Sequence, residues 1–289
     1  MNTRAITRHP LSIILIASAI FILLGSACQL VNVSTSVPPV KPAVTTLPAQ
    51  PPTAMPAPTD KPVAQPTPAS SGSSGEISLD LSGVAQDQTV ETVPAVSADA
   101  GGPFWEVLPQ YQRMTLQGYP VPAHMLKPQI FIFPVSGLAS ANEGAGKIAS
   151  DLQALLQNQQ VGDHLPFLPL FNASQVMHAQ VKYLDFKSGK GVRFLTQFDQ
   201  APLPINDYEL FYTFQGLTSD GKYYIAAVLP VMHPDLPASQ QVNDQQQAEL
   251  NDFPTYLAKT VSMLEGQPGD SFTPDLAKLD ALIQSIEIK

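Results

Sequence analysis

Histidines and carboxylates are the residues of this chain whose types could support hydrolysis. His178 lies near the start of one alternating run and Asp185 near its end, while His233 and Asp235 follow another run. If the predicted strands curl together, these four side chains could converge on one cleft. Isolated histidines are more commonly structural or solvated, so convergence is the condition on which this hypothesis depends. A hydrolase built on His178, His233, Asp235 and Asp185 is one hypothesis for the function.

Two motif matches fail because of their context. Residues 144–147 (GAGK) stand before a predicted helix, but a phosphate-binding loop requires a hydroxyl residue where Ile148 stands. Residues 219–222 (SDGK) have the Ser-x-x-Lys spacing of penicillin-binding enzymes, whose serine begins a helix, whereas Asp-Gly favours a tight turn. The histidines lack the spacing of a helical zinc site, and Cys28 is the only cysteine. We therefore expect no metal and no cofactor.

Aromatic residues suggest a different function. The residues concerned are Trp105, Tyr208, Tyr212, Tyr223 and Tyr224. Core packing is the default explanation for such side chains. Tyrosines fall on both faces of two predicted strands, however, and together with Trp105 they could line a ligand-binding groove. The sequence thus offers a candidate groove as the alternative to a catalytic cluster.

The elements that would position these residues are strands. Four runs alternate or are rich in β-branched and aromatic residues, at 177–186, 192–200, 208–217 and 222–231. Their short connections predict antiparallel neighbours in a meander. The run 222–231 is apolar on both faces, which is typical of a central strand. Arg193, Gln197 and Asp199 share one face of the second run, which predicts a sheet covered by helices on one side only.

Further elements flank this meander. Strands are predicted at 110–117 and 129–135, and apolar residues at helical spacing predict helices around 148–156, 253–264 and 276–283. A short final strand is expected at 286–288. The sequence therefore predicts an α+β fold with an antiparallel four- to six-stranded meander sheet flanked by helices. The ending LDALIQSIEIK resembles that of PsbP/Mog1-like domains, and this resemblance implies a non-catalytic accessory or binding role.

The amino terminus has the pattern of an export leader. Arg4 and Arg8 precede an apolar run from Leu11, and residues 24–28 (LGSAC) resemble the lipobox of bacterial lipoproteins, with Gly25 where an aliphatic residue is usual. The resemblance implies a diacylglycerol on Cys28 and cleavage just before it. The alternative is an uncut anchor, because 11–33 carry no charge and about 20 apolar residues span a bilayer. Both place the remainder of the chain outside the cytoplasm.

Composition divides the chain into three parts. We predict a signal peptide or membrane anchor at 1–27, a linker at 28–102 that begins with the lipidated cysteine, and a globular domain at 103–289. Residues 38–68 hold eleven prolines, and residues 70–75 are serine and glycine. Such a segment forms neither helix nor sheet, so we expect a disordered and extended tether.

Charge limits the possible partners. The net charge is −9, and it becomes −11 once Arg4 and Arg8 leave with the leader. An acidic protein is unsuited to nucleic acid. The expected partners are the membrane, through the lipid or anchor helix, and possible additional ones are another envelope protein or a small ligand. We therefore expect a protein on the outer face of the cytoplasmic membrane or in the cell envelope. Its domain would be a non-catalytic binding module, the hydrolase described above, or a structural spacer.

Overall fold

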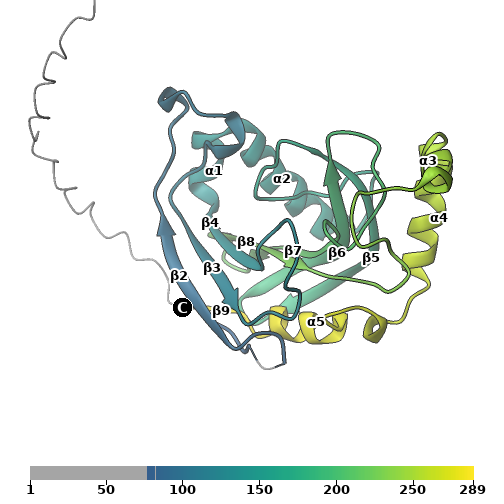
Figure 1. The fold of residues 1–289 in the computed structure, drawn as a ribbon. Coiled ribbons are helices and arrows are strands. Elements are labelled where there is room, and N and C mark those ends of the chain that lie inside the picture. The colour runs from purple at the N-terminus through teal and green to yellow at the C-terminus, as the bar shows by residue number, and fades with distance from the viewer. Residues whose placement is uncertain (1–76, 82) are drawn as a thin grey trace, which may run out of the picture. The chain divides into compact units, whose positions relative to one another are not determined.

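The computed structural model describes residues 77–81 and 83–289 (Figure 1). The strands are β1 (Ile77–Ser78), β2 (Asp87–Val93), β3 (Tyr111–Gln117), β4 (Gln129–Pro134), β5 (Ser174–Phe186), β6 (Gly189–Asp199), β7 (Phe211–Thr218), β8 (Tyr223–Pro230) and β9 (Glu287–Ile288). The helices are α1 (Val135–Ala141), α2 (Glu143–Asn158), α3 (Asp244–Leu250), α4 (Phe253–Glu265) and α5 (Leu276–Gln284). The predicted leader, Cys28 and the proline-rich segment lie outside the described residues. Within the described part, no helix is long and apolar enough to cross a bilayer.

A seven-stranded antiparallel sheet organises the fold. Its strand order is β2-β3-β4-β8-β7-β6-β5, so the last four strands form the predicted meander. The strand that is apolar on both faces, β8, occupies the middle position, as predicted. Gly221 has a φ of +69° in the β7–β8 connection, a conformation that suits glycine in the predicted tight turn. The α+β prediction is confirmed.

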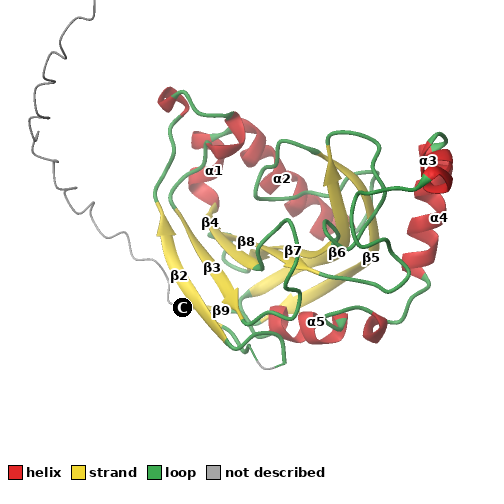
Figure 2. Ribbon diagram, viewed as in Figure 1, coloured by secondary structure: helices red, strands yellow, loops and turns green. Residues whose placement is uncertain are grey.

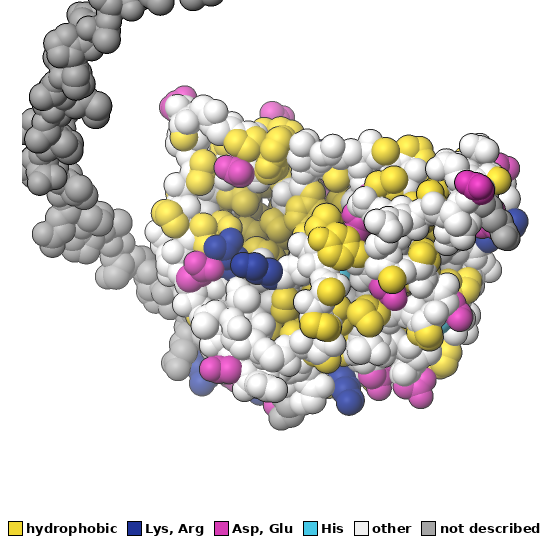
Figure 3. Space-filling model, in the orientation of Figure 1, with side chains coloured by type: hydrophobic (Ala, Val, Ile, Leu, Met, Phe, Trp, Pro, Cys, Tyr) yellow, Lys and Arg dark blue, Asp and Glu magenta, His cyan; other side chains and the backbone are white. Residues whose placement is uncertain are grey.

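Helices cover both faces of this sheet, which creates two hydrophobic cores (Figure 2). On one face, α5 and the end of α4 pack on side chains such as Ile130, Ile132 and Leu195. On the other face, α1, α2 and a loop pack on alternate residues of the same strands, including Phe131 and Phe133. The period of two in strand side chains therefore divides each strand between two cores. Figure 3 shows hydrophobic side chains around a hollow in the region of α2.

The prediction of a sheet covered on one side only is wrong. Arg193, Gln197 and Asp199 are between 0% and 7% exposed, although their types suggested a solvent-facing surface. Each finds a partner inside the protein: Arg193 lies beside Asp280 of α5, and Gln197 donates to Asp199. Buried polar groups are tolerated when they are paired in this way, and the sequence pattern alone does not reveal the pairing.

The predicted linker boundary at residue 102 is also wrong. Ile77–Ser78 forms β1, which pairs with β9, and β2 pairs with β3 along its whole length. The strand β2 lies at the edge of the sheet, so most of its side chains are exposed and polar, and Val90 is 52% exposed. Its sequence therefore lacks the apolar alternation that marks a half-buried strand. It adds a seventh strand to the four to six that were predicted.

Candidate ligand-binding pocket

The predicted aromatic groove is not formed. Tyr212 and Tyr224 are both fully buried, and they face opposite cores of the sheet. Tyr208 and Tyr223 lie at opposite ends of the β7–β8 hairpin, and Trp105 packs its ring against Phe104 at 5.2 Å. Tyrosines on adjacent strands were correctly placed on two faces of the sheet. Because both faces are covered, those faces are interior rather than a cleft.

The predicted catalytic residues are also dispersed. His178 lies on the edge strand β5, opposite Thr196 of β6, whereas His233 follows the end of β8. The strands β6 and β7 lie between β5 and β8. Three interstrand spacings amount to about 14 Å. Asp185 lies farther along β5, beside its hairpin. The strands therefore do not bring these residues into one cleft.

The two histidines of that predicted set lie in separate surroundings. His233 is 2% exposed, its Nε2 lies 3.1 Å from Ser271 Oγ, and its ring packs on Phe272. The carboxylate of Asp235 is exposed and 3.9 Å from His233 Nδ1. Burial lowers the pKa of His178, and the Glu265 carboxylate opposes that shift. His233 is therefore buried, and the acid that acts on His178 is Glu265 rather than a member of the predicted set.

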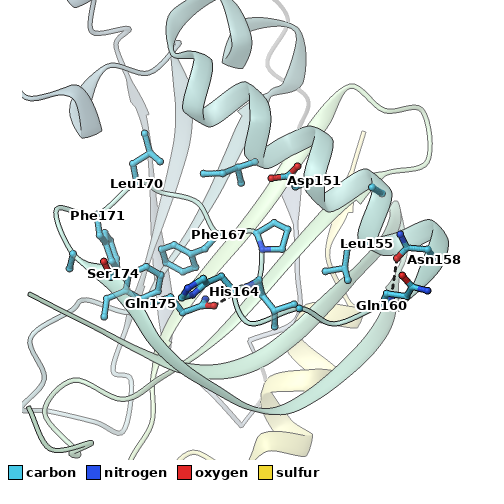
Figure 4. A pocket seen from close by; sticks show the side chains of 17 residues that line it. Asp151, Leu155, Asn158, Gln160, His164, Phe167, Leu170, Phe171, Ser174 and Gln175 are labelled. Atoms are coloured by element: carbon cyan, nitrogen blue, oxygen red, sulfur yellow. Dashed lines mark hydrogen bonds between the residues drawn. The ribbon is translucent and has the colours of Figure 1, made fainter. Parts of the chain in front are cut away.

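A pocket of about 620 Å³ lies between α2, the loop that follows it and the ends of β5 and β6 (Figure 4). Asp151 and Leu155 come from α2, and Phe167, Leu170 and Phe171 come from the loop. Gln175 comes from the start of β5 and Phe198 from the end of β6. This volume is in the range of small-molecule sites.

The loop 166–171 (PFLPLF) that lines the pocket is held by side-chain hydrogen bonds from the sheet. Gln215 of β7 accepts a hydrogen bond from the amide of Leu168 at 3.0 Å and donates one to its carbonyl at 3.1 Å. Tyr224 Oη donates to the same Gln215 oxygen at 2.7 Å. The buried side chain of Gln215 therefore satisfies the backbone amide and carbonyl of Leu168, which a neighbouring strand would satisfy in a sheet. The helix opposite, α2, is capped by Asn142, whose side chain accepts a hydrogen bond from the Ala145 amide.

Phenylalanines form the apolar part of the pocket. Phe167, Phe171 and Phe198 line it, and Phe211 of β7 lies beneath them. All six pairs of ring centroids among these four are separated by 4.6 to 6.3 Å. Phe171 and Phe198 remain partly exposed. Apolar ring surface is therefore open to a ligand in a concave site.

Polar groups surround this apolar surface. Asp151 is already paired with Lys147 at 2.6 Å, and Asn158 accepts from the amide of Gln160. Gln175 is 8% exposed, and its Oε1 accepts from the amide of Leu165 at 2.8 Å. Among the described residues, the Nε2 of Gln175 finds no hydrogen-bond partner. The pocket wall thus contains a buried donor that the described part of the chain does not satisfy.

The sequence contained one indication of this pocket, but it predicted only that the loop 166–171 is buried. An apolar loop between prolines, with two phenylalanines, cannot be regular structure, so its side chains must be covered by something. Which rings remain partly open depends on where α2 and β6 pass, and a local pattern does not contain that information. Among the described residues, no group of three or more histidines, cysteines and acids is placed to hold a metal ion.

No family model, curated protein or solved structure significantly matches this chain. The interpretation of the pocket therefore rests on its own geometry.

A second polar feature lies under the loop that joins β6 to β7. Gln197 Nε2 donates to Asp199 at 2.7 Å and to Glu209 at 3.4 Å, and Asn206 also donates to Glu209. Burial raises the pKa of Asp199 to about 6, and the nearby charge of Glu209 acts in the same direction, while the Gln197 hydrogen bond opposes it. Asp199 and Glu209 therefore accept hydrogen bonds from the same buried amide of Gln197. The free-energy cost of this arrangement depends on pH.

We expect Asp199→Asn to stabilise the domain at neutral pH. The folded pKa of about 6 exceeds the value near 3.8 of an unperturbed carboxyl. The folded state therefore binds the proton more tightly, and the stability gained at low pH is lost as pH rises from about 4 through 6. The asparagine variant should gain on the order of 1–3 kcal/mol at neutral pH and nothing at pH values below about 4. Urea unfolding across this range measures the difference.

The matched control is Asp235→Asn, at a carboxylate that is 60% exposed. It should leave the pH dependence of unfolding unchanged. Equal stability of the wild type and Asp199→Asn at every pH would contradict the assignment of the raised pKa to Asp199.

Proposed function

We propose that this protein is a membrane-tethered, extracytoplasmic lipoprotein whose folded domain binds a small molecule without catalysis. The observation that carries the binding role is the pocket, with its phenylalanine surface and its unsatisfied buried donor at Gln175. A pocket of this size and composition is typical of ligand sites. The separation of His178 from His233 favours the binding role over the hydrolase alternative. A purely structural spacer protein would not require a preformed aromatic cavity.

The lipoprotein part of the proposal rests on the sequence. Arg4, Arg8, the apolar run and the LGSAC segment support export and lipidation at Cys28. The acidic composition supports a protein that meets the membrane through its lipid or anchor helix rather than through basic residues or nucleic acid. A second envelope protein remains compatible with this placement as a partner of the domain.

The binding role is tested with phenylnaphthylamine, an uncharged probe whose fluorescence rises in apolar surroundings. We expect saturable fluorescence enhancement with the wild-type protein, because the partly exposed rings of Phe171 and Phe198 offer an apolar site. Saturation separates a site from general hydrophobic adsorption. Enhancement that stays linear and unsaturated with the folded wild type would contradict the proposed function.

The tether is tested by Cys28→Ser. The wild type is expected to incorporate labelled fatty acid and to partition with membranes, whereas the serine variant should lose the label, because the thioether requires the thiol. Labelling in intact cells followed by mass determination of the amino terminus measures both. An unlabelled wild type that still fractionates with membranes would replace lipidation by the uncut anchor. A wild type found free in the cytosol would overturn the extracytoplasmic placement.

A further inference from the structure

We infer that the pocket takes a planar, uncharged and mainly apolar molecule that carries a hydrogen-bond acceptor such as a carbonyl oxygen. Gln175 is the residue that recognises this acceptor. The inference rests on the proposed binding function and defines the chemical class of the ligand. Three features of the pocket support it: its rings, its charge and its unsatisfied donor.

The rings favour a flat apolar body. Phe167 lies 4.6 Å from Phe198 and 5.1 Å from Phe171, and Phe171 meets Phe198 nearly edge to face at 82°. Rings held at these angles present both faces and edges to a guest, which a planar molecule can meet in the offset and edge-to-face geometries that aromatic groups prefer. Leu155 and Leu165 of the lining extend the apolar surface.

The charges favour an uncharged ligand. Among the lining residues Asp151 is the one acid, and it is already paired with Lys147 at 2.6 Å. The lining residues that the structure describes include no lysine or arginine. A charged guest would leave water for a cavity without a free counter-ion, which is unfavourable in apolar surroundings. An uncharged guest avoids that cost.

The acceptor follows from Gln175. Its two side-chain ends are distinguishable here, because only the oxygen can accept from the Leu165 amide at 2.8 Å. The nitrogen end is therefore Nε2, a donor in a side chain that is 8% exposed, and this donor has no partner within residues 77–81 and 83–289. A buried donor without a partner is costly, and an acceptor that enters the pocket removes the cost. Recognition of a carbonyl by Gln175 is thus favoured over recognition of a hydrocarbon.

The experiment compares coumarin with naphthalene, two flat bicyclic probes of which only coumarin has a carbonyl acceptor. Dissociation constants are measured with the full-length wild type and with Gln175→Glu at about pH 8. Glutamate keeps an oxygen for the Leu165 amide and loses the donor. The wild type should bind coumarin about tenfold more tightly than naphthalene, and Gln175→Glu should remove that preference. Gln241→Glu, the same change at an exposed residue outside the pocket, should retain it.

The outcomes separate this inference from the proposed function. If the wild type binds both probes equally, or if Gln175→Glu keeps the preference, the recognition of an acceptor by Gln175 is wrong while the binding role stands. If the folded wild type binds neither probe and does not bind phenylnaphthylamine, the binding role itself is wrong. If Gln175→Glu does not fold, the ratio of the two constants in the wild type still decides whether the pocket prefers an acceptor.

Discussion

Replacing Asp280 with alanine is expected to lower the free energy of unfolding by about 3 to 5 kcal/mol, the cost of breaking one side of a buried ion pair. Asp280 lies on α5 and is 6% exposed. Its Oδ1 lies 3.2 Å from Arg193 Nε and accepts from Tyr212 Oη at 3.0 Å. Arg193 is 6% exposed and also donates to the Gln180 carbonyl. The alanine variant would leave the guanidinium buried without a carboxylate, and the helix α5 would lose its polar contact with the sheet.

Two control variants separate this buried pair from surface electrostatics. Lys182 donates to the other oxygen of Asp280 at 2.8 Å, but its side chain is 54% exposed, so Lys182→Met should cost less than about 1 kcal/mol. The double variant Arg193→Met with Asp280→Leu should recover most of the loss, because apolar residues of similar volume can replace a buried pair. Urea unfolding measures all three. A loss below about 1 kcal/mol for Asp280→Ala would show that the pair does not hold α5.

Replacing Phe171 with alanine is expected to weaken the binding of phenylnaphthylamine by at least about tenfold. The Phe171 ring lies on the loop, within 5.1 to 6.3 Å of the three other phenylalanine rings, and it lines the pocket. Its removal deletes apolar surface that the ligand would cover. Because this side chain is only partly buried, the domain should lose less than the 3 to 5 kcal/mol typical of a core phenylalanine. Fluorescence titration and urea unfolding measure the two effects separately.

The matched control is Phe104→Ala. Phe104 is 62% exposed and its ring contacts Trp105, outside the pocket. This variant should bind the probe as the wild type does. Equal affinities for the wild type and Phe171→Ala would place the probe elsewhere on the protein and would contradict the assignment of the pocket as its site.

Much of the fold could be predicted from local patterns. The run that became β8 is apolar on both faces and does lie at the middle of the sheet. Asn142 caps α2 because an asparagine side chain can accept a hydrogen bond from an amide at the start of a helix. These features depend on residues that are neighbours in the chain, so a single sequence contains them.

The rest depends on contacts between distant segments. Arg193 pairs with Asp280, which lies 87 positions later in the chain, so its burial could not be seen in the pattern of β6. The strand β2 lies at the edge of the sheet, so most of its residues are exposed and polar. Its sequence therefore lacks the apolar alternation that identifies a strand, although β2 is fully paired with β3. Tyr212 and Tyr224 were candidates for a groove, but the helices that cover both faces of the sheet make them core residues. The phenylalanine rings of the pocket likewise meet through contacts between segments that are separate in the sequence.

The central claim is that the surface formed by Phe167, Phe171 and Phe198 is a small-molecule site, and one measurement tests it most directly. Coumarin is titrated into the isotopically labelled wild-type protein, and the shifts of assigned backbone amides are followed by NMR. The pocket geometry predicts saturable shifts concentrated at residues 164–175 and at Phe198. Saturable shifts centred on another region, such as the surface of α4, or the absence of shifts at residues 164–175 would contradict it.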